Sequence, residues 1–190
     1  CAPIIEVFPP PKKLILPALK EMRLHQWVKN VLIFTPLILG GQIFNLAAWL
    51  VALQGFIALG LVASANYIIN DMLDLSEDRK HWSKSSRPIA SGDLSLRSGA
   101  LLALLSLTVG FTVAAYIGLS IFGLLLAYLA TTLVYSFSLK RIPILDVVFL
   151  AGLFSSRLLL GGILTGVQIS SWLMIFSMFV FTSLSLSKRH

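Results

Sequence analysis

Long apolar windows separated by short polar connections dominate the pattern along the chain. They fall near residues 28–46, 48–70, 98–117, 120–139, 143–164 and 170–187. Each is close to the roughly 20 residues that an α-helix needs to cross the hydrocarbon of a bilayer. The pattern therefore predicts an all-α, polytopic membrane bundle with six spans in residues 21–190, preceded by a proline-rich linker in residues 1–20.

The composition agrees with a membrane protein and excludes several other classes. Of 190 residues, 57% are hydrophobic and 12% are charged, whereas a soluble domain carries about 25% charged residues. A single cysteine, Cys1, excludes an internal disulfide and a cysteine-based zinc site. The chain starts at Cys1 and stops directly after an apolar window, so we interpret it as a fragment of a longer protein.

The net charge of +7 follows the connections between windows and does not indicate a nucleic-acid partner. All basic residues except Arg157, and all eight acidic residues, fall on alternate connections or at the window ends beside them, and hence on one face of the membrane. The positive-inside rule makes that face cytoplasmic, and we expect a bacterial inner membrane. Arg157 lies inside the fifth window, where it is either functional or a structural arginine bonded to backbone carbonyls, Ser155 or Ser156.

Three carboxylates follow the second window at spacings of three and four residues: Asp71, Asp74 and Asp78. On a helix these spacings place them on one face, where their repulsion favours a bound cation. Mg²⁺ prefers one or two carboxylates together with phosphate oxygens and water. The basic loop that follows would neutralise a diphosphate, and the alternative is a solvated helix end balanced by ordinary loop cations.

Other polar residues border the apolar windows on the same face. Lys29 and Asn30 lie at the start of the first window and either reach the site or remain at the interface. Tyr135 and Lys140 end the fourth window, where an aromatic followed by Lys-Arg is also typical of an interface anchor. No nucleophilic triad, glycine-rich nucleotide loop or metal-binding histidine pair is present in the sequence.

These motifs resemble the UbiA superfamily of intramembrane prenyltransferases. The resemblance rests on the Asn70-Asp71-x-x-Asp74-x-x-x-Asp78 run, on Arg87-Pro88-Ile89-Ala90-Ser91-Gly92, and on the Arg23–Asn30 and Tyr135–Arg141 segments. Within the superfamily, the runs at residues 25–30 and 139–146 are most similar to decaprenyl-phosphate phosphoribosyltransferase-like members. The resemblance implies a nine-helix bundle, of which six helices would be present, with a lateral opening for a polyprenyl chain. The second aspartate motif of typical members is absent from the region that ends at His190.

Together the motifs and the resemblance predict a Mg²⁺-dependent membrane transferase that acts on a polyprenyl lipid with loss of diphosphate. The transferred group is either a prenyl group or a phosphoribosyl group from phosphoribosyl diphosphate. The alternative is a cation-coupled transporter whose pathway is lined by Arg157 and the acidic residues; a CDP-alcohol phosphotransferase is disfavoured because its aspartate motif is missing. The candidate residues are catalytic Asp71, Asp74 and Lys140; metal-binding Asp71, Asp74 and Asp78; and substrate-binding Lys29, Asn30, Asn70, Arg79, Lys84, Arg87, Tyr135 and Arg157.

Overall fold

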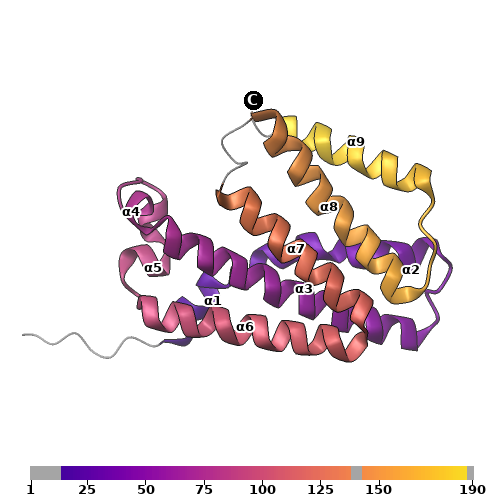
Figure 1. Ribbon diagram of the computed structural model, residues 1–190, viewed down its shortest axis with the longest axis horizontal. Coiled ribbons are helices and arrows are strands. Elements are labelled where there is room, and N and C mark those ends of the chain that lie inside the picture. Colours follow the sequence, from indigo (N-terminus) through magenta and orange to yellow (C-terminus); the bar gives the residue numbers. More distant parts are fainter. Residues whose placement is uncertain (1–13, 138–142, 188–190) are drawn as a thin grey trace, which may run out of the picture.

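The computed structural model describes residues 14–137 and 143–187, and every regular element in these ranges is helical (Figure 1). Four helices are long and apolar enough to cross a membrane: α3 (Leu46–Leu73), α6 (Leu96–Ile117), α7 (Leu119–Phe137) and α8 (Pro143–Thr165). A shorter apolar helix, α9 (Ser171–Ser187), follows. The all-α membrane bundle is therefore confirmed, whereas the count of six spans is not.

The first predicted window does not form one α-helix. The chain there forms a 3₁₀-helix, η1 (Leu24–Phe34), and then a short α-helix, α2 (Thr35–Leu39). A 3₁₀-helix rises about 2.0 Å per residue, so the two segments together extend about 30 Å with fewer residues than a span would need. Gly161 on α8 allows this segment to lie close, because a Cβ at Gly161 would be 2.1 Å from the Ile33 carbonyl oxygen.

Helix α3 lies at the centre of the bundle, with α6 packed along one side (Figure 1). Small side chains make this packing close: Ala52, Ala58 and Ala65 on α3 are fully buried, and Gly110 on α6 faces the Ala58 carbonyl. Small residues at such interfaces let helix backbones approach one another. Helix α3 also contacts η1, α7 and α8, and this packing holds the C-terminal end of α3 in place.

Short helices gather around that end of α3, at the left of Figure 1. They are α1 (Ile15–Glu21), α4 (Leu75–Asp78), η2 (Lys84–Ser86) and α5 (Pro88–Ser91). Asp74 separates α3 from α4, and Gly92 follows α5 with a left-handed backbone (φ 82°). We call this region, from α1 to α5 around the end of α3, the charged end.

Candidate active site

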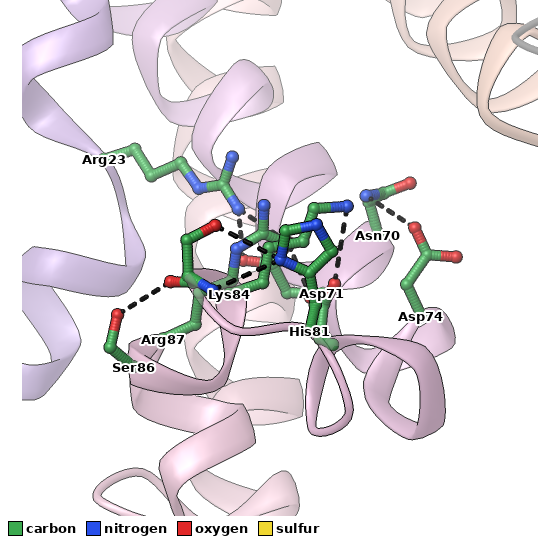
Figure 2. Close-up of polar contacts among 10 residues, drawn as sticks. Arg23, Asn70, Asp71, Asp74, His81, Lys84, Ser86 and Arg87 are labelled. Carbon is green, nitrogen blue, oxygen red and sulfur yellow. Dashed lines mark hydrogen bonds and ion pairs between the residues drawn. The ribbon is translucent and has the colours of Figure 1, made fainter.

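A chain of alternating arginines and aspartates crosses the charged end (Figure 2). Arg23 Nη2 lies 2.7 and 2.5 Å from the two carboxylate oxygens of Asp71, and Arg87 Nη1 lies 2.9 Å from Asp71 Oδ1. The same Arg87 nitrogen lies 2.5 Å from Asp78 Oδ2, and Lys84 Nζ lies 3.8 Å from Asp78 Oδ1. The two aspartates are only 2% and 1% exposed. These ion pairs tie α3, α4 and α5 to the segment that enters η1.

The expectation that Asp71, Asp74 and Asp78 share one face is wrong. Helix α3 ends at Leu73, and Asp74 lies apart from the arginine–aspartate chain beside Asn70, whose Nδ2 donates to Asp74 Oδ2 at 3.3 Å (Figure 2). Because Asp74 stands between α3 and α4, the three aspartates do not lie on one continuous helix, and the helical spacing does not apply to them. The sequence predicted Mg²⁺ beside all three aspartates, whereas in the structure arginine side chains pair with Asp71 and Asp78.

A cavity of about 300 Å³ opens beside Asp74, between α3, α7 and α8. We call it the site cavity. Its wall on α3 includes Asn66, Asn70 and Asp74, and the facing wall on α8 is largely apolar. It brings together seven of the predicted site residues: Lys29, Asn70, Asp74, Lys84, Arg87, Tyr135 and Arg157.

The other predicted residues lie elsewhere. Asp71 and Asp78 are buried in the arginine–aspartate chain, so a role as metal ligands would require the arginines to release them. Arg79 is exposed and its Nε donates to the Ala90 carbonyl at 3.3 Å. Asn30 is buried and accepts a hydrogen bond from Arg157. Lys140 lies outside the described residues.

Several residues of the site were not predicted. One of them is Arg23, which has a left-handed backbone (φ 50°) and lies 48 positions before its partner Asp71. Asn66, Tyr67, Tyr128 and Thr132 line the site cavity from within apolar windows. One signal was available for Asn66: Asn66, Asn70 and Asp74 recur every four residues and so form one polar line along an apolar helix.

The oxygen atoms of this line fit a magnesium ion. Asn66 Oδ1 is buried and has no hydrogen-bond partner among the residues that the structure describes. Asn70 and Asp74 follow it toward the charged end, and we call the part of the cavity there, which Lys84 and Arg87 also line, its mouth. Hard oxygen donors with one or two carboxylates, completed by phosphate oxygens and water, are what Mg²⁺ takes in proteins. Within residues 14–137 and 143–187, no group of three His, Cys, Asp or Glu side chains could hold a metal without such help.

Glu21 is a buried carboxyl at the edge of the arginine–aspartate chain. It is 1% exposed, and neither side-chain oxygen has a hydrogen-bond partner in the described part of the chain. Burial, reinforced by the neighbouring Asp71 carboxylate, raises the pKa of Glu21 from 4.5 to about 7. Glu21 is therefore partly protonated at neutral pH.

Arg157 lies inside α8 and is 6% exposed. Its guanidinium donates to Asn30 Oδ1 at 3.0 Å, to the Tyr128 hydroxyl at 3.3 Å and to the Leu153 carbonyl oxygen. The two serines considered as partners bond elsewhere, Ser155 to Ser177 and Ser156 to the Leu153 carbonyl.

Comparison with known proteins gives one family. The profile described as the UbiA prenyltransferase family matches residues 31–187. Protein y4nM of Sinorhizobium fredii is 46% identical over 172 residues, which cover 90% of this chain and 33% of that protein. A decaprenyl-phosphate phosphoribosyltransferase of Corynebacterium glutamicum is 34% identical over 185 residues, which cover 95% of this chain and 56% of that protein.

The fold matches a solved UbiA homolog from Archaeoglobus fulgidus bound to GPP and Mg²⁺. The TM-score is 0.72 at 21% sequence identity, over 88% of this chain and 60% of that chain. The chain therefore spans between a third and three fifths of the length of the relatives it matches.

Proposed function

The chain belongs to the UbiA prenyltransferase family, and on this basis we propose that the complete protein is a Mg²⁺-dependent membrane transferase. Its reaction joins a polyprenyl lipid to a second group with loss of diphosphate. The observation that carries the proposal is the site cavity, in which Asn70 and Asp74 lie beside Lys84 and Arg87, opposite an apolar wall. The transporter alternative loses its support, because the family and the named relative are transferases.

In the proposal, some residues at the mouth of the cavity bind the metal ion and others bind the phosphate groups. Asp74 and Asn70, with Asn66 behind them, would hold Mg²⁺, which when bound neutralises charge that develops on a departing diphosphate. Lys84 and Arg87 contact the phosphate oxygens. Arg87 is already oriented by Asp71 and Asp78, so little reorganisation is needed when the substrate arrives.

Two transferred groups suit this cavity. The likeness to a decaprenyl-phosphate phosphoribosyltransferase favours phosphoribosyl diphosphate as donor. A phosphate oxygen of the polyprenyl phosphate then bonds to C1 of the ribose as the bond from C1 to the diphosphate oxygen breaks, and diphosphate leaves with the electron pair. The fold shared with a homolog bound to GPP favours, as second candidate, prenyl transfer from a prenyl diphosphate.

The remaining predicted residues take supporting roles in the proposal. Tyr135 lines the cavity, and its hydroxyl donates to Asp146. Lys140, beyond the end of α7, remains a predicted contact to the phosphates. We place the charged end on the cytoplasmic side of a bacterial inner membrane, because basic residues gather there: Lys20, Arg23, Arg79, Lys80, Lys84 and Arg87.

The test is product analysis with the complete protein in membranes. Incubation with Mg²⁺, polyprenyl phosphate and phosphoribosyl diphosphate is expected to yield a polyprenyl phosphoribosyl phosphate, detected by mass spectrometry and lost after chelation with EDTA. A prenylated acceptor lipid formed in the same membranes from prenyl diphosphate, without phosphoribosyl diphosphate, would select the second candidate. No product from either donor would overturn the proposal.

A further inference from the structure

Arg157 is a charge inside the apolar zone without a carboxylate partner among the described residues. Its three hydrogen bonds go to an amide oxygen, a hydroxyl and a backbone carbonyl, all of them neutral. These bonds use three of the five N–H groups that a guanidinium carries. A charged side chain within a bilayer is costly, and such residues mark substrate or ion pathways.

A second cation lies on the same stretch of the cavity wall. The guanidinium of Arg157 lies 5.3 Å from the ring centroid of Phe154, and Lys29 Nζ lies 6.0 Å from the same centroid. Both side chains line the site cavity. The ring is therefore approached by two positive charges, one from η1 and one from α8.

Of these two cations, Arg157 lies deeper than the mouth of the cavity. Arg157 is about 20 Å along α8 from its first residue, and its partner Tyr128 is about 13 Å before the end of α7. Asp74 and Lys84, in contrast, follow the end of α3 at the charged end. The site cavity thus has two cationic parts, a mouth suited to a metal-bound diphosphate and an inner part built on Arg157.

We propose that Arg157, Tyr128 and Lys29 bind the phosphate head group of a polyprenyl monophosphate, the acceptor substrate. The inference rests on the proposed function and assigns the part of the cavity in which the acceptor of that reaction would place its head group. A phosphate monoester carries about −1.5 to −2 charges at neutral pH, which two cations balance. The unused N–H groups of Arg157 suit phosphate oxygens, because guanidinium groups bind phosphate through pairs of hydrogen bonds.

A lipid chain has a path away from this head-group position. An apolar groove of about 420 Å³ runs between α7, α8 and α9, and it shares the walls formed by Tyr128 and Leu153 with the site cavity. A phosphate beside Arg157 would therefore leave its isoprenoid chain in this groove, and its oxygens would point along the cavity toward the donor at the mouth.

If Arg157 had only a structural role, its substitution would affect ligand binding in a different way. Arg157 joins η1, α7 and α8 through its three hydrogen bonds, so its loss could loosen the bundle. Loosening would weaken binding of any isoprenoid, whereas loss of an anion subsite weakens binding only of the phosphorylated one. The ratio of affinities for a monophosphate and its alcohol separates the two roles.

The first experiment measures that ratio. The complete protein in nanodiscs, without Mg²⁺ or diphosphate, is titrated with farnesyl monophosphate and with farnesol. Arg157→Gln is expected to weaken monophosphate binding about 10- to 100-fold, the effect of losing charge-assisted hydrogen bonds, and to leave farnesol binding unchanged. Arg97→Gln makes the same chemical change at an exposed position at the start of α6 and should change neither affinity. Equal losses for both ligands, or none, would overturn the subsite.

Two further variants keep the test valid if Arg157→Gln does not fold. Tyr128→Phe removes one hydroxyl and Lys29→Gln removes one charge, and each should lower the monophosphate affinity about 2- to 10-fold relative to farnesol. If neither variant changes this ratio, the inference is wrong.

A crossed kinetic experiment separates this inference from the proposed function. Lys84→Gln should raise KM for phosphoribosyl diphosphate and not KM for polyprenyl phosphate, and Arg157→Gln should do the reverse. If the protein makes no phosphoribosyl product but binds farnesyl monophosphate through Arg157, the proposed reaction fails and the subsite stands. If turnover occurs and Arg157→Gln leaves KM for polyprenyl phosphate unchanged, the subsite fails and the reaction stands.

Discussion

At the scale of single residues, Asp71 and Asp74 have different surroundings although three positions apart. Asp71 is 2% exposed and held by two arginines, each about a quarter exposed. Asp74 lines the site cavity beside Asn70. The first carboxylate therefore stabilises the charged end, and the second lines the cavity in which we propose that a metal-bound substrate lies.

Substitution of each aspartate should separate these roles. Asp74→Asn in the complete protein should lower kcat at least about 100-fold, as loss of one electrostatic group in a site does, with an unchanged unfolding midpoint. Asp71→Asn should lower the free energy of unfolding by about 1–3 kcal/mol, because Arg23 and Arg87 lose their shared partner. Both are measured by product assay and thermal unfolding in detergent.

Glu77→Gln is the matched control for both substitutions, because Glu77 is an exposed acid on α4 that does not line the cavity. It should change neither activity nor stability. A stable, fully active Asp74→Asn protein would contradict the assignment of Asp74.

Glu21 gives the charged end a dependence on pH. Because its pKa is raised from 4.5 to about 7, the folded protein binds more protons than the unfolded chain between these values. Stability therefore falls as pH rises through this window, by roughly 1–3 kcal/mol. Glu21→Gln should remove this part of the pH dependence and stabilise the protein above pH 7, as measured by unfolding midpoints from pH 5 to pH 8. An unchanged pH profile in Glu21→Gln would show that other groups cause the dependence.

At the scale of elements, the 3₁₀-helix η1 connects the two parts of the site. Arg23 directly precedes it and pairs with Asp71, and Lys29 and Asn30 on it reach the site cavity and Arg157. Runs of 3₁₀-helix longer than three or four residues are uncommon, so this conformation depends on its packing against α3 and α8. The contact at Gly161 is its closest approach to α8 among the glycine positions.

Gly161→Ala should therefore be strongly destabilising. The added Cβ would lie 2.1 Å from the Ile33 carbonyl oxygen, and η1 and α8 must separate to admit it, at a cost of about 1–3 kcal/mol. Gly152→Ala makes the same change on the same helix where nothing lies within 4 Å. It should be neutral or slightly stabilising, since alanine favours helix more than glycine does. Equal unfolding midpoints for the two variants would contradict the close packing of η1.

At the scale of the whole molecule, the bundle has two ends of different character. Trp82, 89% exposed, lies in the loop after α4, and Phe44, 99% exposed, precedes α3 at the opposite end. If the charged end is cytoplasmic, Trp82→Cys and Phe44→Cys, each in a background of the complete protein without other cysteines, should label from opposite sides. A membrane-impermeant maleimide added to intact cells should label only the second variant. The reverse pattern would invert the proposed orientation.

The long helices were predictable because apolar length is a property of each segment alone, and α3, α6, α7, α8 and α9 follow the predicted windows closely. The conformation of residues 24–39 was not predictable, because it depends on contact with Gly161, which lies on a helix far away in the sequence. The acidic motif was recognisable from the sequence. The different surroundings of Asp71 and Asp74 were not, because Asp71 pairs with Arg23, which lies 48 positions earlier in the chain. Local patterns thus located the site, and long-range partners determined its geometry.

The ion pairs at the charged end also limit how a substrate can arrive. Arg23, Lys84 and Arg87 pair with Asp71 or Asp78, so part of their positive charge is already offset before a substrate arrives. A diphosphate that carries Mg²⁺ would in addition be attracted to the Asp74 carboxylate, which lines the cavity. Metal and donor should therefore enter as one complex, and uptake of the donor should rise and fall with the concentration of the divalent cation.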